Sequence, residues 1–250
     1  MKVLHIALRE FRSFFATPTG WLVLGGYLFL TGVFWTYMVE NYVLQSQDLV
    51  YNPSAAQLLN LTDYLLAPFY GNCATVLIFV LPAVSMRTFS EEFRQRTMEL
   101  LATSPVSTTE IVAGKYLGAL GFVAVLLLVS LYQPVSLMQW GDPDLGVLAG
   151  SYLGLLLLSG LMLSMGLLIS SFTSSQLVAL VLTFAAGLVL MVLDWGAASP
   201  DAWNARLAVS SHLGQLMAGA VKLSDVAYFV LGSSTFLFAT QQRLESFRWS

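Results

Sequence analysis

The chain has 250 residues, of which 57% are hydrophobic and only 10% are charged, whereas about a quarter of the residues of an ordinary globular domain carry charge. This composition, with a mean hydropathy of +0.74, excludes a water-soluble domain and predicts an all-α membrane protein. The net charge of −3 comes without a basic stripe, which argues against nucleic-acid binding, and the single cysteine, Cys73, excludes an intrachain disulfide.

The first forty or so positions predict two helices. In residues 1–18, apolar side chains recur at near-helical spacing while Arg9 and Arg12 lie mostly apart from them. This pattern favours an amphipathic helix along the inner leaflet over a frayed tail. The uncharged run that follows is too long for a secretory signal, so residues 19–39 are expected to form an uncleaved first span.

Five further transmembrane spans are expected from uncharged stretches long enough to cross a bilayer. Residues 145–193 carry no charge and are too long for one helix, so they are interpreted as two spans joined by a polar turn at residues 170–176. The last candidate has a short apolar core, which Gly232, Ser233 and Ser234 interrupt. The spans after the first are predicted at residues 64–86, 116–140, 146–170, 176–193 and 224–241.

The distribution of Lys and Arg predicts how the spans are oriented. Nine of the eleven Lys and Arg residues lie on the side that holds both chain ends, and only Arg206 and Lys222 lie on the other. The nine are Lys2, Arg9, Arg12, Arg87, Arg94, Arg96, Lys115, Arg243 and Arg248. Because positive residues collect in the cytoplasm, both termini and residues 87–115 are expected there, which requires an even number of spans.

Residues 87–115 form the most densely charged segment of the chain. Ser90 is expected to cap a helix whose first turn holds Glu91 and Glu92, with Arg94 further along. The residues alone leave two interpretations open. The segment is either a solvated loop whose basic residues set the topology, or a docking helix for a cytosolic partner.

Pro105 is expected to end this helix, and a second N-cap, Ser107 or Thr108 with Glu110 nearby, is expected to start the third span. Small residues at four-residue spacing permit close contact between helices. They occur at Gly114 with Gly118 and at Gly150 with Gly154.

Several function classes are disfavoured by what the apolar cores lack. The apolar cores of the six predicted spans, which in the last span run from Val226 to Thr240, contain no Asp, Glu, Lys, Arg or His, although ion pumps and proton-coupled transporters need such groups within the membrane. The sequence also has no GxxxxGK[ST] phosphate loop, no HExxH and no CxxC, so this chain is not expected to hydrolyse ATP by itself.

An ordered series of residues runs through the charged segment and into the third span. It comprises Met86, Arg87, Phe89, Glu91, Glu92, Arg94, Thr97, Glu99, Leu100, Leu101, Pro105, Val106, Gly114 and Lys115. This series resembles the signature of ABC-2 type permeases, with Arg96 standing where that family usually has glycine.

The two ends of the chain resemble the gliding-motility type of the same family. The N-terminal residues that match are Arg9, Glu10, Phe14, Phe15, Pro18 and Trp21. Near the C-terminus they include His212, Gly219, Val221, Asp225, Tyr228, Phe229, Phe236, Leu244, Glu245 and Trp249. The resemblance therefore extends over essentially the whole chain.

The resemblance implies a fold in which residues 1–250 form a single transmembrane domain. Its six spans would be preceded by an amphipathic connecting helix at residues 1–18. A cytoplasmic coupling helix would lie within residues 87–115, between spans two and three, and a re-entrant external segment at residues 194–222, between spans five and six.

The resemblance also implies the permease subunit of an ATP-driven exporter in the bacterial inner membrane, not an enzyme. Its partners would be a second permease copy or a paralogue, membrane lipid, and cytosolic ATP-binding subunits. Those subunits would hold ATP and Mg, and this chain would bind no cofactor or metal. Docking to the ATP-binding subunit would fall on Arg87, Glu91, Glu92, Arg94, Met98, Glu99 and Leu101.

Three alternatives stay open at this point. His212 is a candidate gate residue that could sense pH, or a histidine that only packs and hydrogen-bonds. A membrane scaffold could use the same ATPase docking to transmit force without moving a substrate. An autonomous channel or secondary carrier is disfavoured by the uncharged cores.

Overall fold

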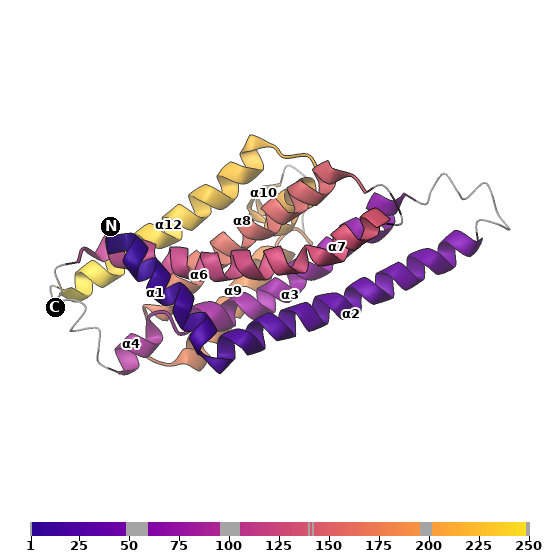
Figure 1. Cartoon of the computed structure of the whole chain (residues 1–250). Coiled ribbons are helices and arrows are strands. Elements are labelled where there is room, and N and C mark those ends of the chain that lie inside the picture. Colours follow the sequence, from indigo (N-terminus) through magenta and orange to yellow (C-terminus); the bar gives the residue numbers. More distant parts are fainter. Residues whose placement is uncertain are drawn as a thin grey trace.

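The structure is a computed structural model that describes residues 2–48, 60–95, 106–139, 141, 143–195 and 202–248. Within these residues all regular secondary structure is helical, and the long helices lie side by side in an elongated bundle (Figure 1). The elements are α1 (Lys2–Ala16), α2 (Pro18–Asp48), the π-helical turn η2 (Thr62–Leu66), α3 (Ala67–Ser85), α4 (Ser90–Arg94), α6 (Thr108–Ser130), α7 (Tyr132–Ser136), the 3-10 turn η3 (Leu137–Gln139), α8 (Leu145–Ser170), α9 (Gln176–Val192), α10 (Trp203–Leu207), α11 (Val209–Met217) and α12 (Leu223–Arg248). The predicted all-α class is confirmed.

Among the described residues, five helical segments are long and apolar enough to cross a membrane. They are Pro18–Gln47, Tyr64–Arg94, Thr108–Gln139, Leu145–Ser170 and Leu223–Phe247. The remaining predicted span, residues 176–193, corresponds to α9, which is apolar but has only 17 residues. At the rise of an α-helix it is about 25 Å long, near the lower limit for a crossing.

Two predicted spans are shorter than the helices that contain them. The first was expected to end at residue 39, but α2 continues to Asp48. The last was expected to end at residue 241, but α12 continues to Arg248. Hydropathy marks only the apolar part of a helix, and about 20 residues suffice to cross the hydrocarbon core, so the polar ends of both helices were missed.

The third span begins as predicted at the second N-cap. The Ser107 hydroxyl accepts a hydrogen bond from the Glu110 amide at 3.2 Å, and the Glu110 carboxylate accepts one from the Ser107 amide at 3.0 Å. The helix α6 then ends at Ser130, because Pro134 has no N–H to donate to the carbonyl of that residue. The predicted span to residue 140 is therefore a broken one, completed by α7 and η3.

The predicted cap at Ser90 is wrong. The N-cap position of α4 is Phe89, and Ser90 is the first helical residue, with its hydroxyl donating to the carbonyl of Met86. The chain passes from α3 into α4 through a single tight turn, so Ser90 already lies within helical geometry when α4 begins. A serine in that position bonds back to the preceding turn and does not cap the helix.

The helix α8 lies at the centre of the bundle and is buried along most of its length, packing against α3, α6, α9, α11 and α12. In contrast, α2 lies at the periphery, where its buried positions are Gly20, Tyr27 and Thr31. Thr31 accepts a hydrogen bond at 3.2 Å from the amide of Gln133, next to the break in α6. The large side chains that α2 exposes between Trp21 and Leu44 are mostly apolar, as a lipid-facing surface requires.

Both pairs of small residues serve close contacts, but neither contact joins two spans. A Cβ atom at Gly118 of α6 would lie 2.7 Å from the carbonyl oxygen of Ala7 in α1, and one at Gly150 of α8 would lie 2.6 Å from that of Leu216 in α11. These glycines therefore bring two peripheral helices, α1 and α11, against the bundle.

We expect Gly118→Ala to destabilise the protein by about 1–3 kcal/mol, because the added methyl group forces α1 away from α6. Thermal unfolding in detergent would measure the loss. The matched control is Gly71→Ala in α3, where a Cβ would meet nothing within 4 Å. That control should change stability by about 1 kcal/mol at most. Equal effects of the two substitutions would contradict the close α1–α6 packing.

Candidate functional site

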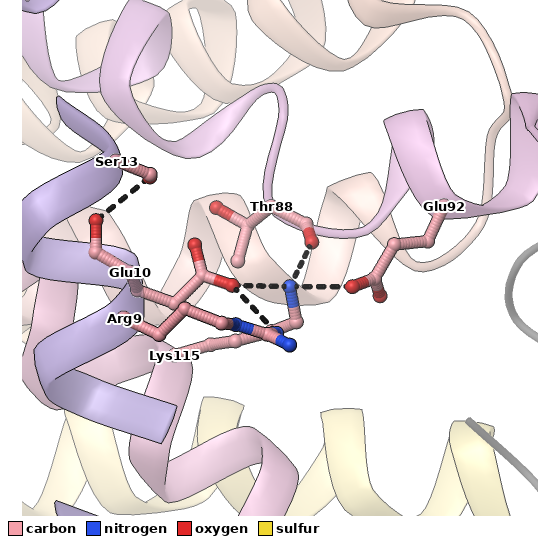
Figure 2. Close-up of polar contacts among 6 residues, drawn as sticks. All are labelled: Arg9, Glu10, Ser13, Thr88, Glu92 and Lys115. Carbon is pink, nitrogen blue, oxygen red and sulfur yellow. Dashed lines mark hydrogen bonds and ion pairs between the residues drawn. The ribbon is translucent and has the colours of Figure 1, made fainter. Parts of the chain in front are cut away.

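A cluster of charges occupies the end of the bundle where α1 begins, α4 lies and α12 ends, which we call the terminal end (Figure 1). Its centre is Lys115, in the second turn of α6, whose side chain is only 3% exposed. The Lys115 ammonium lies 3.0 Å from Glu10 Oε1 of α1 and 2.8 Å from Glu92 Oε1 of α4. It also donates at 2.8 Å to the carbonyl of Thr88, in the turn between α3 and α4. We call these four residues the Lys115 cluster (Figure 2).

The geometry of the cluster satisfies the buried ammonium completely. A lysine ammonium has three protons, and the cluster provides three acceptors from α1, α4 and the turn before α4. The ring of Phe89 adds a cation–π contact, with Nζ 5.2 Å from its centroid. A buried charge is tolerated only when it is paired and hydrogen-bonded, so these partners make it possible to bury Lys115.

Two partly buried carboxylates, Glu10 and Glu92, surround the single ammonium. Arg9 lies 3.5 Å from Glu10 on the exposed side and supplies a second positive charge there. Glu92 lies deeper, and its burial raises the pKa of this carboxyl above the ordinary value of 4.5, a rise that the nearby Lys115 ammonium only partly offsets.

A small apolar core beneath α4 fixes its position. Phe89 is fully buried with Ile111 and Val112 of α6, and this group also includes Leu167 and Leu244. One turn later, the ring of Phe93 meets that of Phe247 of α12 edge-on, with centroids 5.4 Å apart. The helix α4 is therefore attached to α6, α8 and α12 as well as to Lys115.

The outward side of α4 presents a second pair of charges. Arg94 and Glu91 form an ion pair at 3.6 Å between positions three residues apart, with side chains 58% and 37% exposed. Gln95 donates to the same carboxylate at 3.0 Å. These groups are accessible to a partner, and the pair itself contributes little to stability because water screens it.

A cavity of about 270 Å³ lies between α1, α3 and α4, lined by residues that include Glu10, Glu92 and Lys115. Arg87 also lines it and donates at 2.8 Å to the hydroxyl of Thr19, which connects the end of α3 to the start of α2. Across the described residues, no group of three or more His, Cys, Asp or Glu side chains is placed to hold a metal ion.

The predicted docking residues separate into three groups. Arg94 is exposed on the outward side of α4, where Glu91, which also lines the cavity, pairs with it. Glu92 turns inward to Lys115, and Arg87 lines the cavity beside it. The predicted contributions of Met98, Glu99 and Leu101 lie outside the described residues.

Lys115 was used only for topology and as a match to the permease signature, and Glu10 only as a match at the N-terminal end, so neither was predicted as a site residue. A lysine at the start of an apolar span is ordinarily a solvated residue that sets topology, and no local pattern connects two positions that lie 105 residues apart. The signal that could have found them is Gly118, because a glycine one turn beyond Lys115 marks a close helix contact at that depth.

The candidate gate residue His212 lies in a second polar group, in α11. Its Nδ1 is 2.7 Å from Asp225 Oδ1 of α12, and its Nε2 is 3.0 Å from the carbonyl oxygen of Arg206. The ring stacks on Tyr228, with centroids 4.2 Å apart, and the Tyr228 hydroxyl donates to the Leu207 carbonyl at 2.6 Å. His212 therefore connects α10, α11 and the start of α12.

The bundle, its charged terminal end and its long apolar helices agree with the match to known families. Residues 4–242 match the family described as ABC-2 family transporter protein. The chain belongs to this family. Members are membrane components of ABC transporters, so the chain is a multi-pass membrane protein of the type implied for a permease. A comparison with curated proteins finds no match.

We expect Lys115→Met to destabilise this ABC-2 family member by about 3–5 kcal/mol, because it leaves Glu10 and Glu92 partly buried without their shared cation. Arg94→Gln removes one partner of the exposed pair and should cost about 1 kcal/mol or less. Unfolding of both variants in the same detergent provides the comparison. Similar losses would show that Lys115 is effectively solvated.

The pH dependence of the Glu92 contribution follows from its raised pKa. A carboxyl whose pKa rises on folding stabilises the fold fully below its unfolded-state pKa and loses that contribution as the pH rises through the folded-state value. The stability of the wild type relative to Glu92→Gln should therefore fall as the pH is raised from about 4.5. Melting temperatures of the two proteins over that range test this, and a difference that grows with pH would show that the ion pair outweighs desolvation.

Proposed function

We propose that this chain is the permease subunit of an ATP-driven exporter, in which a separate cytosolic subunit binds ATP and Mg. Membership of the ABC-2 family supports this proposal, as does the arrangement of the terminal end. That end carries both chain termini and α4, and the Lys and Arg residues around it favour a cytoplasmic location (Figure 1). The membrane is then the bacterial inner membrane, and α9 completes a set of six spans.

In this proposal α4 begins the coupling helix, with its outward side as the docking surface. The single observation that carries the proposal is the division of charge on α4, where Glu91 and Arg94 are accessible while Glu92 is held by Lys115. A partner that binds the outward side pushes on a helix whose inward side is attached to α1 and α6. The predicted docking role of Glu92 therefore becomes an anchoring role, and the docking surface continues into residues 96–101.

The same division suggests how force reaches the spans. The Lys115 cluster joins α4 to α6, which is part of the third span, and to α1, which leads directly into α2. Movement of α4 against the ATP-binding subunit would therefore act on the first and third spans together. The substrate path is proposed to lie between this bundle and a second copy or a paralogue, as in the gliding-motility type that the chain ends resemble.

The docking proposal is tested by exchanging the two accessible charges, in the double variant Glu91→Arg, Arg94→Glu. The exchange keeps an ion pair within α4 but reverses the charges that face the partner, so retention of the ATP-binding subunit should fall roughly tenfold or more. Co-purification in mild detergent, followed by ATPase activity in lipid discs, provides the measurement.

The control is Lys222→Gln, which removes an exposed charge far from the terminal end and should leave retention unchanged. If no ATP-binding subunit co-purifies with the wild type, the transporter proposal fails. If the exchange variant retains the partner as well as the wild type does, docking does not use the outward side of α4.

A further inference from the structure

The segment that contains His212 is a small helical unit seated on the bundle away from the terminal end. Its longer helix, α11, packs against α8 at the close contact of Gly150 with Leu216. The Ser151 hydroxyl of α8 also donates to the Met217 carbonyl at 3.4 Å. Two elements therefore hold the unit. The contacts with α8 involve no titratable group, whereas the contact with α12 is the His212–Asp225 pair.

Both nitrogens of the His212 ring face hydrogen-bond acceptors. On one side is the Asp225 carboxylate, 2.7 Å from Nδ1, and on the other is the Arg206 carbonyl, 3.0 Å from Nε2. A neutral imidazole has only one N–H, whereas an imidazolium has two. Both contacts are therefore hydrogen bonds only when the His212–Asp225 pair holds one proton more than a neutral ring and a carboxylate contain.

Few other titratable groups surround the contact between His212 and Asp225. Asp225 is buried, and its second oxygen has no hydrogen-bond partner within the part of the chain that the structure describes. From α12 the stacked Tyr228 also faces the ring and is titratable. From α10 the ring contacts the backbone carbonyl of Arg206, which does not titrate. The sequences of α8 and α9 contain no charged residue.

We propose that His212 and Asp225 form a proton-dependent latch that holds α10 and α11 to the start of α12. With the proton present, the ring donates to both acceptors and the charges attract. When the pH on that side of the membrane rises and the proton is lost, the neutral ring has one N–H for two acceptors, so one of its two hydrogen bonds is lost and the latch weakens. Histidine side chains in general change charge between about pH 5 and 8, and this range sets the two pH values at which the latch is compared. This inference depends on neither the ATP-binding partner nor the identity of the substrate.

The chain contains two histidines, so a His5→Gln background leaves His212 as the only one. His5 is exposed on α1, away from the latch. In this background, in lipid discs, ¹⁵N spectra of the imidazole report its protonation directly. Hydrogen–deuterium exchange of residues 203–217 reports how firmly the unit is held. Comparing the background with His212→Gln at each pH cancels the intrinsic pH dependence of exchange.

We expect protection of residues 203–217 to be roughly tenfold greater in the background than in His212→Gln at about pH 5.5, as loss of a charge-assisted hydrogen bond predicts. The ratio should approach one by about pH 8.5, when the proton is gone. Asp225→Asn should lower protection at the acidic pH as His212→Gln does. The control Ser151→Ala removes a hydrogen bond that does not titrate, so its effect should be the same at both pH values.

A protection ratio that does not change with pH would overturn the proposal. So would ¹⁵N spectra of the background protein that show a neutral imidazole at the acidic pH. The spectra need no substitution at His212 or Asp225, so they decide the question even if those variants do not fold.

Discussion

The terminal end of the bundle depends on one requirement, that the buried ammonium of Lys115 must have acceptors for all three of its protons. The acceptors come from Glu10 in α1, Glu92 in α4 and the Thr88 carbonyl in the turn between α3 and α4. Withdrawing any one of these segments leaves a charge or a proton of the buried ammonium unsatisfied. The amphipathic helix, the short helix and the third span therefore keep a common geometry, even though α4 has only five residues of its own.

Two local features bring this arrangement about. The capping box at Ser107 fixes where α6 begins, which places Lys115 about two turns inside the helix. Because Gly118 has no side chain, the backbone of α1 packs directly against α6 at this position, and Glu10 reaches the ammonium. The glycine acts on electrostatics as well as on packing, because the ion pair forms only where the two backbones approach closely.

The features that were predicted correctly from the sequence depend on residues that lie close together along the chain. Uncharged stretches located the long helices, and the Ser107 cap was correct because its partner, Glu110, lies three positions away. The cap at Ser90 was wrong because the end of α3, and not the local sequence, determines where α4 begins.

The sites depend on contacts over long distances in the chain, which a local pattern cannot express. Lys115 and Glu10 meet through the packing of α1 on α6, and the inward direction of Glu92 follows from which face of α4 the core beneath it buries. His212 was noticed as a candidate, but its partner Asp225 lies beyond a turn, at the start of the next helix. In each case the residue type was visible and the partner was not.

The attachment of α2 has a mechanical consequence. This helix has 31 residues, and its buried contacts with the rest of the bundle centre on Tyr27, Thr31 and the ring contact of Trp35 with Phe69. Lipid solvates the outward apolar surface as well as protein would, while partly buried side chains between Val23 and Tyr42 and the Arg87–Thr19 hydrogen bond hold the inner side of the helix. Its fully buried side chains, Tyr27 and Thr31, lie near the middle of the helix, so a tilt about them moves its two ends in opposite directions. From Thr31 the arms are about 20 Å toward Pro18 and about 26 Å toward Asp48, so a tilt imposed where α1 meets α2 reappears, slightly magnified, at the far face of the membrane.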